Sequence, residues 1–297
     1  MISNKRKYKY MRLFSRIPII RQIGVYISVL FSSQTILNKN IEERIELTSG
    51  YGINRIIKEL KKDGISKCIK LNKETVKHIL EYINDKPVFA LRNPQLGYYL
   101  KDHKKMEEKL GKEILLAQYN NIEENNLFSE IVNSPLLLNV AKQYLGKYVK
   151  KVGTILWWTF PSNVSDEERI KHAHFFHRDV DDYKFLKIFF YLTDLEKGDG
   201  THVFVKGTQN PGFKEFFNEG FRVKRYTDAQ INKRYPEKLF EVLGKSGDGF
   251  VEDTLGFHKA NTPVKNPRLA FEITYAINDY DIMNDIVSED KMFINEF

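Results

Sequence analysis

The sequence is poor in cysteine. It contains one, Cys68, among 297 residues. A single cysteine cannot close a disulfide within the chain, and it has no second cysteine with which to build a CxxC zinc site. A disulfide-stapled scaffold and a cysteine-based zinc fold are therefore excluded. We expect a protein of a reducing compartment, with cytoplasmic localisation, either free or associated with the cytoplasmic face of a membrane.

Acidic residues are missing from the first 40 positions. This segment holds eight Lys and Arg and no Asp or Glu, so its charge equals the +8 of the whole chain. The remainder, residues 41–297, is electrically balanced. Because affinity for nucleic acid depends mainly on neutralising phosphates, a balanced body predicts no nucleic-acid partner.

Long hydrophobic runs are also missing. The cleanest run, residues 23–31, has nine residues, whereas roughly 20 are needed for a spanning helix. Three interpretations of segment 1–40 stay open: a helix lying on a membrane surface through residues 1–35, a helix packed on the body or a partner, and a secretory signal. The apolar positions near helical spacing are Leu13, Ile17, Ile20, Ile27 and Phe31.

In the rest of the chain, the predicted secondary structure changes from mostly helices to mostly strands near residue 150. Residues 41–150 predict helices over 53–62, 73–83 and 135–145, with short strands over 65–69 and 114–118. Residues 150–277 predict strands over 151–160, 184–193, 202–205, 249–253 and 268–276, because β-branched and aromatic residues gather there between turn residues. A tail, 278–297, follows. Helices first and strands after predict an α+β fold for one domain over 41–297.

A histidine and an aspartate lie two residues apart in the stretch HFFHRDVDD, at the edge of an apolar segment. If this stretch is a strand, His177 and Asp179 point the same way. One imidazole and one carboxylate are two thirds of the 2-His-1-carboxylate set that binds non-haem Fe(II). His258 is the one histidine after His202, and it can supply the third ligand. The neighbouring His172, His174, Asp181 and Asp182 are not expected to be ligands, and the two aspartates are expected in a turn, solvated or capping.

An arginine follows His258 ten residues later, at the start of a strand with clear alternation. Arg268 shares a face with Ala270, Glu272 and Thr274, opposite an apolar face. A guanidinium beside a metal is a natural anchor for a carboxylate, because its planar fork binds both oxygens. Lys187 and Thr159 are further candidates for cosubstrate contact, although a snorkelling lysine and an ordinary strand threonine remain alternatives.

The order HxD, a long gap, His and then Arg resembles the Fe(II)/2-oxoglutarate-dependent dioxygenases. The segments FHRDVDDYKFLKIFFYLTDL, GDGTHVFVKGTQN and GFHKANTPVKNPRL are similar to the phytanoyl-CoA dioxygenase-like branch, over about residues 150–277. GTQN departs from the commoner Gly-Ser-His ending, and Ala260 stands where some members have serine.

This resemblance implies a double-stranded β-helix, a jelly-roll or cupin-like barrel, with packed N-terminal helices. It implies that His177, Asp179 and His258 hold Fe(II), that Arg268 pairs with the distal carboxylate of 2-oxoglutarate, and that dioxygen is the second cosubstrate. The expected reaction is hydroxylation of a C–H bond in a small-molecule, lipid or lipid-linked glycan substrate, with release of succinate and carbon dioxide.

Two other functions remain open from the residues. Zinc accepts the same nitrogen and oxygen ligands, so a zinc-dependent hydrolase could use the same three side chains. A catalytically silent, membrane-associated binding protein is the other alternative. The zinc interpretation leaves Arg268 unexplained, and the silent one leaves the three ligands unexplained.

Overall fold

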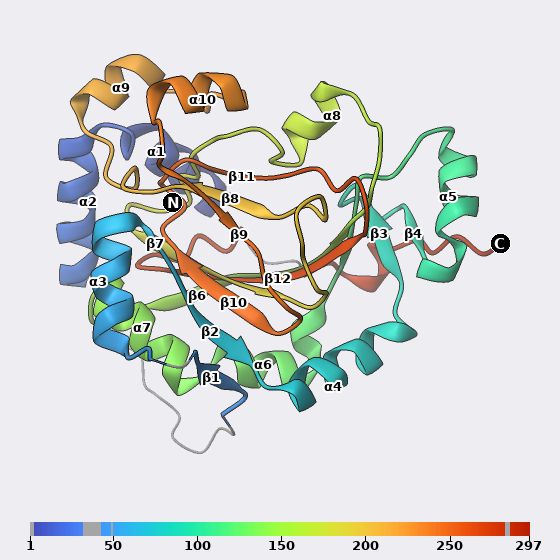
Figure 1. Cartoon of the computed structure of the whole chain (residues 1–297). Coiled ribbons are helices and arrows are strands. Elements are labelled where there is room, and N and C mark those ends of the chain that lie inside the picture. Colours follow the sequence, from blue (N-terminus) through green and yellow to red (C-terminus); the bar gives the residue numbers. More distant parts are fainter. Residues whose placement is uncertain (1–2, 32–42, 49, 283–285) are drawn as a thin grey trace.

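A computed structural model describes residues 3–31, 43–48, 50–282 and 286–297. It confirms the α+β class: a large antiparallel sheet is covered by helices on one face and by a small sheet on the other (Figure 1). The helices are α1 Asn4–Phe14, α2 Pro18–Phe31, α3 Ile53–Asp63, α4 Lys73–Asn84, α5 His103–Leu110, α6 Asn126–Val132, α7 Pro135–Leu145, α8 Asp166–Lys171, α9 Phe213–Glu219 and α10 Asp228–Arg234. The strands are β1 Ile45–Leu47, β2 Ile65–Leu71, β3 Val88–Ala90, β4 Gly97–Tyr98, β5 Leu116–Tyr119, β6 Lys150–Thr159, β7 Phe185–Tyr191, β8 His202–Val205, β9 Leu239–Val242, β10 Asp248–Glu252, β11 His258–Ala260 and β12 Arg268–Ala276.

The strands form two sheets. The large sheet has the order β1-β2-β10-β7-β12-β6-β5-β3-β4, and the small one has the order β11-β8-β9. Strands from before and after residue 150 belong to the same large sheet. Strands β1–β5 come before residue 150 and helices α8–α10 come after it, so the predicted change from helices to strands near that residue marks no boundary in the fold.

Alternation along the central strands builds two apolar layers. On β12, Leu269, Phe271 and Ile273 point away from the small sheet. They pack with residues of α3, α4, α6 and α7 in the main core. On the opposite face of the large sheet, Phe189 and Phe250 pack against residues of the small sheet such as Phe204. The space between the two sheets is therefore part core and part cavity, and the cavity holds the polar residues discussed below.

Most predicted elements are confirmed to within a few residues, and local chemistry explains their ends. Helix α4 begins after Asn72, whose side chain accepts a hydrogen bond from the Thr75 N–H at 2.8 Å. Helix α3 ends at Gly64, which has φ of 84°, a left-handed conformation that glycine adopts without strain. Strand β5 begins two residues later than predicted. Helices α8 and α9 lie outside the helices and strands predicted from the sequence.

The N-terminal segment forms two helices, since Pro18 begins a new one, and both contact the body. The Tyr8 hydroxyl lies 3.2 Å from an Asp181 carboxylate oxygen, and Asn278 Nδ2 donates to Ser28 Oγ at 2.9 Å. A Cβ on Gly24 would meet the Tyr183 ring at 2.4 Å, so the helix lies very close there. None of the helices in the described residues is long and apolar enough to cross a membrane. The Phe31 side chain and residues 32–40 lie outside the described part of the chain.

Candidate metal centre

His177 and His258 are neighbours across an isolated antiparallel bridge. The His177 N–H donates to the His258 carbonyl and the His258 N–H donates to the His177 carbonyl, both at 3.0 Å. Two residues further, the Asp179 N–H donates to the Thr254 carbonyl at 2.9 Å. This pairing brings together residues that are some 80 positions apart in the chain. The two imidazole rings have centroids 4.3 Å apart.

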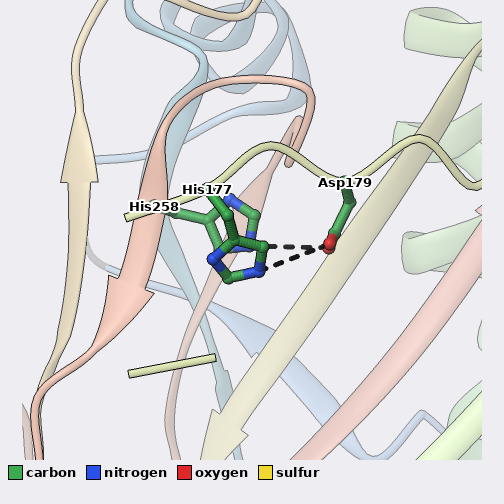
Figure 2. Close-up of side chains that lie close together, drawn as sticks. All are labelled: His177, Asp179 and His258. Atoms are coloured by element: carbon green, nitrogen blue, oxygen red, sulfur yellow. Dashed lines mark ion pairs between the residues drawn. The ribbon is translucent and has the colours of Figure 1, made fainter. Parts of the chain in front are cut away.

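The three side chains converge on one point. The ligand atoms of His177, Asp179 and His258 all lie within 4.8 Å of one another. Each histidine Nε2 is 3.5 Å from a different oxygen of the Asp179 carboxylate (Figure 2). The Nδ1 of His177 lies 2.9 Å from the Phe175 carbonyl oxygen, and the Nδ1 of His258 lies 3.0 Å from the Gly256 carbonyl oxygen. This second contact favours the tautomer with the proton on Nδ1, which leaves the Nε2 lone pair directed at the shared space.

The backbone that carries His177 and Asp179 is not a regular strand, contrary to the expectation. It is extended and makes only isolated bridges, from Phe176 to Tyr226 and from His177 to His258. Extended geometry is enough to alternate the side chains. Arg178, between the two, points away from the centre. Its guanidinium carbon lies 3.8 Å from the centroid of the Phe257 ring, and its Nε lies 3.1 Å from a Glu219 carboxylate oxygen. His177 and Asp179 therefore reach the same space although the backbone between them is not part of a regular strand.

The electrostatics of the three groups suit ligation of a cation. Burial lowers the pKa of His177 to about 4, so the ring is neutral at physiological pH. Burial alone would raise the pKa of Asp179, but Lys187 first and His258 next hold it well below its usual range. Burial also opposes a charge on His258, yet the Asp179 carboxylate raises its pKa. An anionic oxygen and imidazole nitrogens are the donor set that Fe(II) and Zn(II) accept.

Arg268 lies in the same cavity, 3 % exposed. It donates to the Gly200 carbonyl and, at 3.0 Å, to the Thr159 hydroxyl, while its Nε has no hydrogen-bond partner. Within the described residues no carboxylate lies within ion-pair distance of this guanidinium. Thr159 thus positions the arginine. A buried, unpaired cation is costly unless a ligand compensates it.

Lys187 also faces the cavity, and the snorkelling alternative is wrong. Its Nζ lies 3.0 Å from Asp179, 3.2 Å from Asp181 and 3.1 Å from Glu272. Because an ammonium has three N–H donors, these contacts leave none for a cosubstrate. The position of Lys187 suits orientation of the Asp179 carboxylate.

The two aspartates were expected to be solvated or capping; neither is solvated, and only Asp182 is a cap. Asp181 faces the cavity and Lys187, because the extended chain continues the alternation from Asp179. Asp182 is buried and accepts the backbone N–H groups of Tyr183, Ile277 and Asn278. Asp182 is a capping group, as one expected alternative had it, but it is shielded from water.

The cavity holds a second arginine, Arg92, which lies outside every sequence motif named above. Arg92 follows β3 and lines the cavity, whose volume is about 250 Å³. Leu91 and Arg92 have φ of 56° and 59°, a conformation that side-chain-bearing residues rarely adopt in succession. Within the described part of the chain, Arg92 has no ion pair or hydrogen bond through its side chain. The turn residues after it, Asn93 and Pro94, were the one local signal.

The other histidines of the region take different places. His202 lines the cavity, lies 2.8 Å from the buried Glu252 carboxylate and stacks on His258 with centroids 5.7 Å apart. His172 lines the cavity wall and lies 3.3 Å from Glu168. His174 contacts the Thr262 hydroxyl at 2.8 Å. In the described residues none of the three joins the group around Asp179, as expected for His172 and His174.

No protein-family model matches the sequence, and neither does any curated protein. Solved structures do match in shape. HygX from Streptomyces hygroscopicus with nickel, 2-oxoglutarate and hygromycin B bound has a TM-score of 0.52 at 11 % identity, over 82 % of this chain and 96 % of that chain. HygX with nickel and 2-oxoglutarate bound has a TM-score of 0.50 at 12 % identity, over 75 % of this chain and 86 % of that chain. At such low identity these likenesses establish a shared fold.

Proposed function

We propose that this protein is an Fe(II)- and 2-oxoglutarate-dependent dioxygenase whose metal ligands are His177, Asp179 and His258. The observation that carries the proposal is their convergence in one cavity with an unpaired, buried Arg268. A zinc hydrolase would need the three ligands but has no use for this arginine. The fold shared with HygX, which was solved with nickel and 2-oxoglutarate bound, supports the same conclusion.

The donor set fits the metal. Two imidazole nitrogens and one carboxylate would hold Fe(II) and leave room on the metal for a chelating oxo acid and a gas molecule. With Fe(II), 2-oxoglutarate and dioxygen bound, the centre supplies oxidative decarboxylation to succinate and carbon dioxide, coupled to oxidation of a substrate C–H bond. We propose hydroxylation as the outcome, and the two facing sheets as a double-stranded β-helix of the phytanoyl-CoA dioxygenase-like type.

The protein's own residues bind, orient and exclude water. Arg268, held by Thr159 and the Gly200 carbonyl, would pair with the distal carboxylate of 2-oxoglutarate. Lys187 fixes the Asp179 carboxylate through a contact at 3.0 Å, and the Phe175 and Gly256 carbonyls fix the two imidazoles. Aromatic side chains such as Phe189 and Phe250 line the wall and keep water out. Arg92 offers a second cation, for the other cosubstrate carboxylate or for an acidic group of the substrate.

The substrate we propose is a small molecule, lipid or lipid-linked glycan, in a cytoplasmic setting. Comparative mass spectrometry of metabolites and lipids from cells with wild-type protein and cells with the Asp179→Ala variant would identify it as a gain of one oxygen. Its contacts are expected among the side chains that line the cavity, such as Arg92, Ile155 and Trp157.

The first prediction concerns the metal. Purified wild-type protein should bind about one Fe(II) per chain without oxygen and release succinate from 2-oxoglutarate in air. Asp179→Ala should lose both, because it removes the one anionic ligand. Asp181→Asn, which changes a neighbouring carboxylate on the same lysine, should keep its iron. Metal analysis and quantification of succinate check the two effects separately. Wild-type protein that binds zinc but never iron, and that hydrolyses esters without 2-oxoglutarate, would overturn the proposal.

A further inference from the structure

An exposed apolar surface covers the N-terminal helices and α9. We call it the helical patch, and its members are Tyr10, Leu13, Phe14, Ile19, Ile23, Tyr26, Ile27, Leu30, Phe213, Phe217 and Phe221. They are more than half of the 21 large hydrophobic side chains that are exposed in the described residues. Contiguous apolar surface on a soluble protein marks an interaction site.

Helix α2 shows why this surface is not a core face. Its inner side, with Gly24, Val25 and Ser28, lies against the body. Its outer side carries a stripe of apolar side chains, of which Tyr26 is 67 % exposed and Leu30 is 60 % exposed. A surface helix normally places polar residues outward, so this helix is apolar on the side that the body does not cover.

Helix α9 extends the patch. Phe217 is 79 % exposed, the highest value among the exposed large hydrophobic side chains. Arg16 donates to the Arg222 carbonyl at 3.4 Å and Arg21 to the Pro211 carbonyl at 3.2 Å, which join the segment around α9 to the α1–α2 corner. Figure 1 shows α2 and α9 at the same edge of the molecule.

The charged side chains around the helical patch indicate what binds it. The exposed side chains of α1 include Lys5, Arg6, Lys7 and Lys9, and Lys214, Arg222 and Lys224 lie exposed around the phenylalanines of α9. The first 40 residues hold no acid. Apolar side chains bordered by cations match the interface of an anionic bilayer, with acyl chains below and phosphates above. We propose that the helical patch docks this protein on the surface of an anionic membrane, lying on it without crossing.

Docking here would place the membrane against helix α1, which also contacts the wall of the cavity. The Tyr8 hydroxyl of α1 touches Asp181, which lines the cavity and pairs with Lys187. The residues differ from those expected from the sequence: Leu13 and Ile27 belong to the patch, whereas Ile17 and Ile20 are only partly exposed. The surface also includes α9, which is about 200 residues away in the chain.

Vesicle co-sedimentation tests the proposal with the full chain. The probe is vesicles of phosphatidylcholine alone or with 30 mole per cent phosphatidylserine (about one lipid in three, an anionic fraction sufficient for electrostatic recruitment). Wild-type protein should bind the anionic vesicles much more tightly, and salt should weaken this binding. Ile23→Gln and Phe217→Gln should each weaken it by about tenfold, because each removes one exposed apolar side chain that would enter the bilayer. Val264→Gln, at a site that is 73 % exposed and outside the patch, is the matched control and should bind as wild type does.

Two results would overturn the proposal. The first is wild-type protein that stays in the supernatant with anionic vesicles at low salt. The second is a dimer in sedimentation velocity that Phe217→Gln dissociates, which would assign the patch to a second copy of the chain. Circular dichroism of the variants separates loss of docking from loss of fold. Vesicle binding is measured without iron or 2-oxoglutarate, so its result does not depend on whether the protein has the proposed enzyme activity.

Discussion

The guanidinium of Arg268 presents an unpaired charge to the cavity, and its fork geometry matters as much as its charge. Arg268→Lys keeps the cation but loses bidentate contact, so we expect KM for 2-oxoglutarate to rise about 10- to 100-fold, equivalent to the loss of one or two charge-assisted hydrogen bonds. Initial rates of succinate release against 2-oxoglutarate concentration measure it. Arg55→Lys, on the exposed face of α3, is the control. An unchanged KM in Arg268→Lys would mean that the cosubstrate binds elsewhere.

A buried carboxyl near the site makes stability depend on pH. Burial raises the pKa of Asp182 from 3.8 to about 6. The native state therefore holds this proton more tightly than the unfolded state, and the resulting stabilisation is full below about pH 4 and is lost as pH rises through about 6. Asp182→Asn cannot titrate, so the decrease in unfolding free energy over this range should be smaller by up to about 3 kcal/mol.

Urea unfolding at pH 4, 5, 6 and 7 checks this prediction. Asp290→Asn, in an exposed turn near the C-terminus, is the control and should follow the wild type. Burial also raises the pKa of Asp253 to about 6, so part of the dependence of the unfolding free energy on pH should remain in the variant. A curve for Asp182→Asn that is parallel to that of the wild type would contradict the assignment.

At the scale of elements, helix α4 depends on one cap. The Asn72 side chain satisfies the Thr75 N–H, which otherwise has no partner in the first turn. Asn72→Ala should lower the unfolding free energy by about 1 kcal/mol, whereas Asn72→Ser, which keeps an acceptor, should cost less than half of that. Urea midpoints with unchanged m-values measure both. Equal midpoints for Ala and Ser would show that the cap contributes nothing.

Elements with strong local signals were predictable, and weakly specified ones were not. The β12 range was predicted to the residue, because its alternation between an apolar and a polar face spans nine positions. The two-residue spacing of His177 and Asp179 suggests a strand, but this segment makes only isolated bridges. Its partners are single residues from distant parts of the chain. Helices α8 and α9 have six and seven residues, too few for a periodic pattern to stand out from a polar loop.

At the scale of the whole molecule, the site joins segments that are far apart in the chain. Arg92 comes from the turn after β3, His177 from the segment before β7, and His258 from β11 of the small sheet. The N-terminal helices reach the same wall through Tyr8. One cavity thus combines a candidate metal centre, two arginines that have no ion pair within the described residues, and a contact to the N-terminal helix α1.

The α+β class and most elements follow from the sequence, because periodicity and caps are local properties of the chain, and the choice of His177, Asp179 and His258 follows from residue type, the HxD spacing and the few histidines available. The fold set what the sequence leaves open: three carboxylates saturate Lys187, Asp181 faces the cavity and Arg92 enters it. It also decided which side of α2 stays exposed. These features depend on contacts between distant segments, and such contacts leave no periodic mark in either segment alone.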